Sequence, residues 1–249
     1  MNITCKNCNQ HFKGNYCNNC GQAASTGRLN FDSIWEDIKY GLFHFNHKIV
    51  FTTRQLFYRP GHAIRDYIEG KRLDYFKPIS FLLLLASVYA LLNHYFHIQF
   101  IMEGSSDHSV FNRLGLEESN EWIINHFGWL ALLGVPIYSV VTFFIFRKQG
   151  YNFIEHLVTN SFLAAQRYLF LIAVFPVLYY VGTGPYRRLY GWVTLFIEFL
   201  LMMWVYLQFF KDLPKGKTFL LLLASYVLIM LITLLVLVLL LLGAQAYFN

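Results

Sequence analysis

The chain has 249 residues, of which 56% are hydrophobic, 19% aromatic and only 14% charged. Soluble domains carry about 25% charged residues, so an ordinary globular protein, a disordered chain and a coiled coil all fit poorly. A membrane protein is the class that remains. Its 20 Lys and Arg residues outnumber the 14 Asp and Glu residues, and the net charge of +6 suits a negatively charged membrane surface.

The four cysteines all lie within the first twenty residues, as Cys5-x-x-Cys8 and Cys17-x-x-Cys20. Each pair suits a tight turn that presents two thiolates to one ion, and two such turns complete the closed tetrahedral site of structural zinc. Residues 1–24 are therefore predicted to form a zinc ribbon that binds a structural Zn²⁺. The alternative is four free structural cysteines or a redox pair.

This ribbon is expected to stay in a reducing compartment, because the start of the chain lacks the apolar stretch of a signal peptide. Lys6 and Lys13, without a series of stacking aromatic residues, are weak evidence for nucleic-acid binding. No nucleic acid is therefore expected as a partner. Docking to a protein partner, or to the protein's own membrane domain, is favoured.

Residues 28–78 mix aromatic, basic and acidic side chains and are predicted to form interfacial helices. Apolar side chains recur at helical spacing over 30–45, where Ser33 and Glu36 offer a capping box. Trp and Phe at an apolar-polar boundary suit a helix that lies in the headgroup plane. Two further helices are expected over 51–58 and 60–70, the latter with proline in its first turn.

Basic and aromatic residues are interleaved immediately before the first long apolar stretch. Anionic headgroups attract such cations by about 1 kcal/mol each near the surface, so membrane lipid is an expected partner. We interpret this basic collar mainly as a topology determinant with interfacial anchors. A sharper hypothesis is a site for a lipid phosphate or another anion, formed by Arg59, Arg65, Lys71 and Arg72.

From residue 79 onward, long apolar stretches indicate a transmembrane domain over 79–249. A helix needs roughly 20 apolar residues to cross the hydrocarbon core. Isolated strands leave their backbone groups unsatisfied in lipid, and runs of four leucines lack the alternation of a β-barrel strand. We therefore expect an all-α polytopic membrane protein with about five transmembrane helices. Their expected positions are near residues 79–100, 128–146, 157–181, 191–210 and 218–242.

Lys and Arg are distributed unequally between the loops that would alternate across the membrane. The region before the first span holds 11 of them, and the loops before the third and fifth spans add two and three. The opposite side holds three, and one lies inside a span. The positive-inside rule therefore predicts a cytoplasmic N-terminus and an external C-terminus.

The sequence over about residues 1–90 resembles a known family. The resemblance rests on Cys17-Asn18-Asn19-Cys20-Gly21-Gln22, Phe51-Thr52-Thr53, Arg59-Pro60-Gly61, Tyr67-Ile68-Glu69-Gly70-Lys71-Arg72 and Tyr75-Phe76-Lys77-Pro78-Ile79. Together these motifs resemble an uncharacterised family of bacterial inner-membrane proteins, known only as a domain of unknown function. The resemblance implies a zinc ribbon joined to a polytopic domain in the bacterial inner membrane. It implies no activity.

Two expected spans contain a charged side chain, Arg167 beside Gln166 in the third and Glu198 in the fourth. A charge at the centre of a spanning helix costs about 2.5–3.5 kcal/mol on insertion scales, so we predict a pair between the helices that fixes their register. The alternative is a polar cavity or relay. It would also use Asn160, together with Glu155 and His156 at the cytoplasmic mouth of the third span.

No motif identifies a reaction, since the common zinc-protease, nucleophile-elbow and P-loop patterns are missing. The leading hypothesis is a non-enzymatic envelope adaptor or assembly factor whose ribbon recruits a partner. A second hypothesis is a transporter or channel for a small solute or lipid, with a polar site inside the membrane. A third is a membrane-embedded lipid enzyme that uses the basic collar for headgroup phosphate and Glu155 or His156 for acid-base chemistry.

Overall fold

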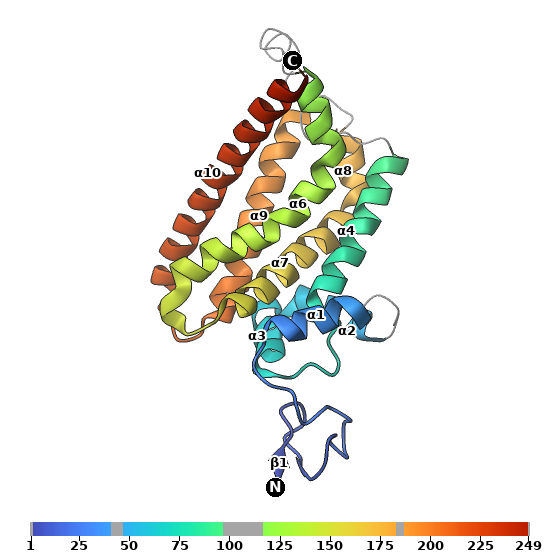
Figure 1. Ribbon diagram of the computed structural model, residues 1–249, viewed down its shortest axis with the longest axis vertical. Coiled ribbons are helices and arrows are strands. Elements are labelled where there is room, and N and C mark those ends of the chain that lie inside the picture. The colour runs from blue at the N-terminus through green and yellow to red at the C-terminus, as the bar shows by residue number, and fades with distance from the viewer. Residues whose placement is uncertain (1, 41–46, 97–116, 183–186, 249) are drawn as a thin grey trace.

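A computed structural model describes residues 2–40, 47–96, 117–182 and 187–248 (Figure 1). A small N-terminal ribbon contains two antiparallel strands, β1 (Ile3–Thr4) and β2 (His11–Phe12). The rest is helical, with three short helices and a bundle of longer ones. The helices are α1 (Phe31–Tyr40), α2 (His47–Tyr58), α3 (Pro60–Glu69), α4 (Pro78–Tyr95), α6 (Glu117–Phe146), the 3₁₀ turn η1 (Arg147–Gln149), α7 (Phe153–Ala173), α8 (Phe175–Gly182), α9 (Arg187–Phe209) and α10 (Lys215–Phe248).

Helix α1 begins at Phe31 because Asn30 caps its first turn. The Asn30 side chain accepts a hydrogen bond from the Ser33 N–H (2.9 Å), and Ser33 Oγ accepts one from the Asn30 N–H (3.0 Å). The reciprocal cap thus involves Asn30 and Ser33, one turn earlier than the predicted cap of Ser33 and Glu36. Residues 41–46, the end of the helix expected over 30–45, lie outside the described residues.

Helices α1, α2 and α3 lie between the ribbon and the long helices (Figure 1). Helix α3 begins at Pro60 and ends at Glu69, with Gly70 as its C-cap in a left-handed conformation (φ 110°), in agreement with the helix expected over 60–70. Arg65 donates to the backbone carbonyls of Gln208 (3.1 Å) and Phe209 (2.9 Å). These carbonyls belong to the last turn of α9, where helical partners are lacking. Helix α3 therefore closes the base of the bundle.

Helix α7 lies inside the bundle and packs against α4, α6 and α9 (Figure 1). The core is rich in aromatic side chains that are at most 1% exposed, among them Phe81, Phe162 and Tyr206. Phe146 at the end of α6 stacks on Phe210 beyond α9, with ring centroids 4.6 Å apart. Such offset aromatic contacts contribute about 0.5–1.5 kcal/mol each beyond their buried area. These contacts fix the lower ends of α6 and α9 to one another.

Two helical segments in the described part of the chain are long and apolar enough to span a membrane, Pro78–Tyr95 and Lys215–Val236. Val193–Phe209 is apolar but shorter. The expectation of five such helices is therefore not supported by length and composition. The third expected span, 157–181, is also divided between α7 and α8 next to Pro176. Proline lacks the N–H that a continuous helix would use there.

Candidate functional site

The four cysteines meet in the ribbon, as their spacing predicts. All four sulfurs lie within 4.8 Å of one another, with Cys5 and Cys20 3.5 Å apart and Cys8 and Cys17 3.6 Å apart. Two thiolates on one zinc, each at about 2.3 Å, lie about 3.8 Å apart in a tetrahedron. The four thiols therefore fit a single tetrahedral metal ion that has no open coordination position.

The two knuckles have the same backbone geometry. The N–H of Cys5 donates to the carbonyl of Gln10, and the N–H of Cys17 donates to the carbonyl of Gln22, both at 2.9 Å. The residue after the second cysteine adopts a left-handed backbone conformation in both knuckles, with φ of 59° at Asn9 and 78° at Gly21. Asn and Gly occupy these positions and tolerate that conformation better than other residues. The fold thus places Gln10 and Gln22 at equivalent positions.

The crowded sulfurs of the ribbon ionise unequally. A backbone hydrogen bond from Gln10 lowers the pKa of the Cys8 thiol to about 6. The equivalent bond from Gln22 acts in the same direction on Cys20, but desolvation and the neighbouring sulfurs outweigh it and raise the pKa of Cys20 to about 12. A divalent cation at the centre would favour the thiolate form of all four.

Gln22 attaches the second knuckle to the end of α3. This side chain is 5% exposed and uses both ends of its amide. Its Nε2 donates to the carbonyl of Gly70 (2.9 Å), and its Oε1 accepts from the N–H of Arg72 (3.2 Å). The Lys6 side chain of the first knuckle also lies against Gly70. Both metal-binding turns therefore rest on the helical bundle.

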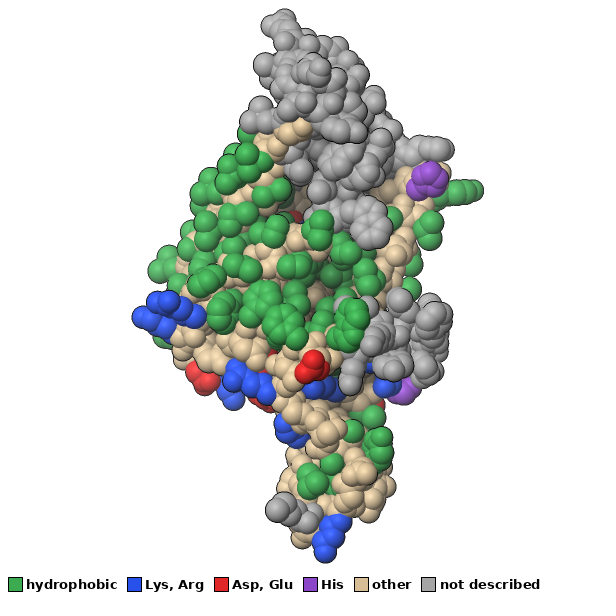
Figure 2. Space-filling model, in the orientation of Figure 1, with side chains coloured by type: hydrophobic (Ala, Val, Ile, Leu, Met, Phe, Trp, Pro, Cys, Tyr) green, Lys and Arg blue, Asp and Glu red, His purple; other side chains and the backbone are tan. Residues whose placement is uncertain are grey.

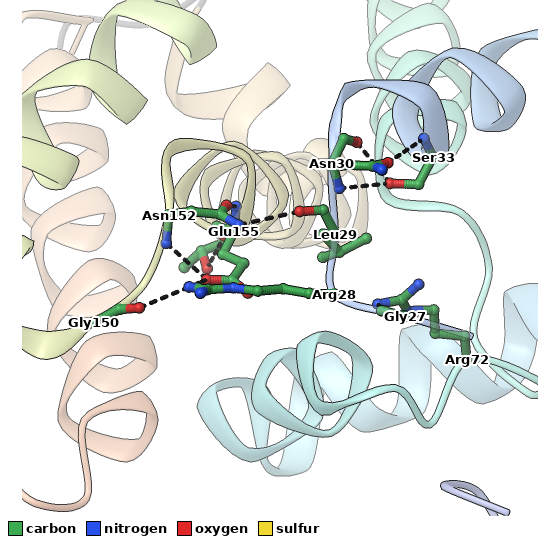
Figure 3. Close-up of polar contacts among 10 residues, drawn as sticks. Gly27, Arg28, Leu29, Asn30, Ser33, Arg72, Gly150, Asn152 and Glu155 are labelled. Atoms are coloured by element: carbon green, nitrogen blue, oxygen red, sulfur yellow. Dashed lines mark hydrogen bonds and ion pairs between the residues drawn. The ribbon is translucent and has the colours of Figure 1, made fainter. Parts of the chain in front are cut away.

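Arg28 makes a second attachment, shown in Figure 3. It binds the Glu155 carboxylate with two hydrogen bonds of 2.8 Å and also donates to the carbonyl of Gly150 (2.7 Å). Glu155 is 4% exposed and completes the N-terminal cap of α7 with Asn152. Asn152 in turn donates to the carbonyl of Leu29 (3.1 Å). This paired, hydrogen-bonded carboxylate raises the pKa of Arg28.

The linker between ribbon and bundle is thus held along its length, because Arg72 also donates to the carbonyl of Gly27 (2.8 Å). The sequence did not single out Arg28 or assign a role to Gln22. Arg28 and Glu155 are 127 positions apart, so no local pattern links them. The equivalence of Gln22 and Gln10 could have been recognised in the sequence, because each glutamine stands two positions after the second cysteine of its knuckle.

Asn160 is the centre of a buried hydrogen-bonded cluster between α6, α7 and α9. Its amide nitrogen donates to Ser139 Oγ (3.2 Å) and Thr142 Oγ1 (2.9 Å). Its oxygen accepts from the Tyr206 hydroxyl (3.1 Å). His156, one turn earlier on α7, is 1% exposed, and its ring nitrogens have no partner among the described residues. The Asn160 cluster satisfies its polar groups internally, as a structural contact between helices does.

Arg167 and Glu198 meet as predicted, with 2.7 Å between Nη1 and Oε1. The pair joins α7 to α9. The neighbouring Gln166 instead donates to the carbonyl of Leu56 on α2 (2.9 Å). Between described residues, no hydrogen bond joins this ion pair to Asn160 or Glu155. The polar residues expected to form one pathway therefore lie in separate local networks.

The four cations of the hypothetical anion site in the basic collar all have acceptors within the chain. Arg59 and Lys71 pair with Asp66 at 3.2 and 2.7 Å. Arg65 binds carbonyls at the end of α9, and Arg72 binds carbonyls that include that of Gly27. These contacts hold the base of the bundle together. Contact of the collar with an anionic lipid remains a prediction.

Comparison with known proteins gives one finding that covers part of the chain. A family model described as a protein of unknown function (DUF3667) matches residues 47–90, which include α2, α3 and most of α4. No curated protein and no solved structure matches the chain. Over α2, α3 and most of α4 the chain is therefore similar to an uncharacterised family, and a Cys₄ cluster with the spacing of a zinc ribbon precedes that segment.

Proposed function

We propose that the chain is an integral protein of a bacterial inner membrane whose zinc-loaded cytoplasmic ribbon is a fixed docking platform. In this role it is a non-enzymatic adaptor or assembly factor. The observation that carries the proposal is the double attachment of the ribbon through Gln22 and Arg28. A platform held in one orientation loses little conformational entropy when a partner binds.

The surface of the bundle supports placement in a membrane. Large apolar side chains cover its flank, and Lys and Arg gather at its lower border, near the ribbon (Figure 2). Leu133, Phe144, Phe196 and Leu231 are each about 60% exposed and lie on three different helices. Soluble monomers rarely expose such continuous apolar area. We infer five spans, with α4, α6, α7 followed by α8, α9 and α10 crossing the membrane and the ribbon on the cytoplasmic side.

Zinc is the metal that best matches four thiolates in a closed tetrahedron. The cysteines would hold it, and it would supply folding free energy to a segment with very little core. Such a site is structural, because no position remains for water or substrate. The role proposed for the ribbon is therefore binding rather than catalysis.

The polar groups in the bundle favour the adaptor over a transporter or a lipid enzyme. Glu155 is occupied by Arg28 and by the cap of α7, Asn160 is fully bonded, and Arg167 is paired with Glu198. In this arrangement Glu155, Asn160 and Arg167 hold helices together, whereas the buried His156 has no hydrogen-bond partner among the described residues.

The outer face of the ribbon is the expected contact surface for a protein partner. Tyr16 is 65% exposed there, and Lys13 and Asn15 beside it are also exposed. Tyrosine is enriched among the residues that dominate binding energy at protein interfaces. We therefore expect Tyr16 to lie within the partner contact.

A photoreactive amino acid at Tyr16, activated in intact bacterial cells, tests the proposal. We expect a discrete protein adduct that is lost when Cys17→Ser removes the metal site, while alkaline extraction still leaves the chain in the membrane fraction. The same amino acid at Leu231 is the matched control, and it should yield lipid adducts only. Failure to form a protein adduct at Tyr16, or an adduct that persists without Cys17, would contradict the adaptor role.

A further inference from the structure

Five cations that take no part in the contacts above lie on two neighbouring connections at the lower end of the bundle, the η1 turn and residues 211–217, which include the first turn of α10. They are Arg147, Lys148, Lys211, Lys215 and Lys217, all exposed. The stacking of Phe146 on Phe210 brings the starts of the two connections together. No ion pair among the described residues engages these cations. Asp212 is the one carboxylate in the two connections, so the surface is strongly basic.

A shallow and largely open apolar depression, called the hollow below, lies next to this basic surface on the outer face of α10. It is lined by Leu220, Leu223, Ala224, Val227, Leu228 and Leu231. The opposite face of the helix packs on the bundle, since Leu222 and Ser225 are fully buried. Ala224 is the smallest of the lining residues, and its short side chain leaves space between the neighbouring leucines.

The basic surface and the hollow are continuous along one face of α10. Lys217, Leu220, Ala224, Leu228 and Leu231 follow one another at intervals of three or four residues. At a rise of 1.5 Å per residue, Ala224 lies about 10 Å and Leu231 about 21 Å along the axis from Lys217. One leaflet contributes about 15 Å of hydrocarbon. The hollow is therefore at the depth of an acyl chain whose headgroup is beside Lys217.

We propose that this face of α10 binds an anionic phospholipid. Its phosphate lies against Lys215 and Lys217, and one acyl chain lies in the hollow over Ala224. The inference rests on the membrane placement in the proposed function. A second copy of the chain in the same orientation is a poor occupant of this face, because the basic surfaces of the two copies would lie together and repel each other. The basic collar is also a poorer lipid site, because its cations are bound internally.

Titration of the purified full chain in detergent tests this site, with native mass spectrometry as the readout. The probes are phosphatidylglycerol and phosphatidylcholine with identical acyl chains. We expect the wild-type chain to prefer phosphatidylglycerol. The double variant Lys215→Gln/Lys217→Gln should bind it about 30-fold more weakly, from about 1 kcal/mol for each cation. The matched control Lys13→Gln/Lys48→Gln removes the same charge elsewhere and should retain the preference.

The hollow is tested separately on the same helix. Ala224→Phe fills it and should lower retention of phosphatidylglycerol, whereas Val236→Phe, at another outward position on α10, should not. Equal binding of the two lipids, or equal losses in variant and control, would overturn the proposal. The proposal would also be overturned if glycerol phosphate displaced phosphatidylglycerol and Ala224→Phe did not change its retention, because the site would then bind a free anion. If the lipid preference fails while the Tyr16 adduct persists, only this inference is rejected.

Discussion

Gly61 lies where α3 crosses the end of α9, and a side chain has no space there. A Cβ at this position would be 2.5 Å from Gln208 Cβ and 2.6 Å from the Phe209 backbone nitrogen. The Gly61 N–H also donates to Gln208 Oε1 (3.1 Å). The obstacle is largely backbone, which cannot rotate away as a side chain can. Glycine is therefore required by close approach, although its φ is unremarkable.

Gly61→Ala is expected to lower the free energy of unfolding by about 2–3 kcal/mol, because overpacking forces α3 away from α9. Thermal unfolding of the purified protein in detergent measures this. Gly216→Ala is the matched control, since its added methyl group meets no atom within 4 Å. Equal melting temperatures for the two variants would show that the contact between α3 and α9 is looser than described.

The Arg167–Glu198 pair gives a second prediction at the scale of residues. Arg167→Ala leaves Glu198 without its cation and should destabilise the protein, because an unpaired charge in a low-dielectric setting is costly. The double variant, which lacks both charged side chains, should recover most of the stability that Arg167→Ala loses. Unfolding of both single variants and of the double variant in detergent completes the cycle. Additive losses would mean that the two residues do not depend on each other.

At the scale of elements, the ribbon and the bundle form one unit through Gln22. Gln22→Ala removes both hydrogen bonds to the loop after α3 and should free the linker, so that trypsin cleaves after Arg28 several-fold faster. Gln10→Ala changes the equivalent position of the other knuckle, where the side chain is exposed, and should leave the cleavage rate unchanged. Equal rates in the two variants would argue against docking through Gln22.

Metal removal should have the same consequence. Without the ion, the four thiols no longer hold the two knuckles together, and the position of Gln22 is lost with them. A strong zinc chelator is therefore expected to accelerate cleavage after Arg28 in the wild-type protein, while circular dichroism reports unchanged helix content. Loss of helix content on chelation would show that the metal also supports the bundle.

Local chemistry predicts some of these elements well. Two Cys-x-x-Cys turns predict the metal cluster, and proline and glycine predict both ends of α3, because each signal lies within a few residues of the feature it determines. The break between α7 and α8 was missed because hydropathy averages over Pro176. The attachment of Arg28 to Glu155 was missed because two surfaces distant in the sequence form it.

At the scale of the whole molecule, the apolar stretches of the sequence predict five spans, whereas two described helical segments are long and apolar enough to cross a membrane. Two segments pass a test of length and composition, and α7 carries too many polar residues to do so. Asn160, Gln166 and Arg167 make hydrogen bonds or an ion pair to neighbouring helices, whereas His156 is buried without a partner among the described residues. A buried helix in a membrane bundle can therefore span without being uniformly apolar. Five spans therefore remain our proposal.

The location of the two chain ends tests this central claim most directly. Five spans place the N-terminal ribbon in the cytoplasm and the C-terminus outside, whereas two spans place both ends on one side. Green fluorescent protein and alkaline phosphatase are fused in turn to each end of the chain in a bacterial host. We expect fluorescence from the N-terminal fusion and phosphatase activity from the C-terminal fusion. Both reporters indicating the same side for the two ends would contradict it.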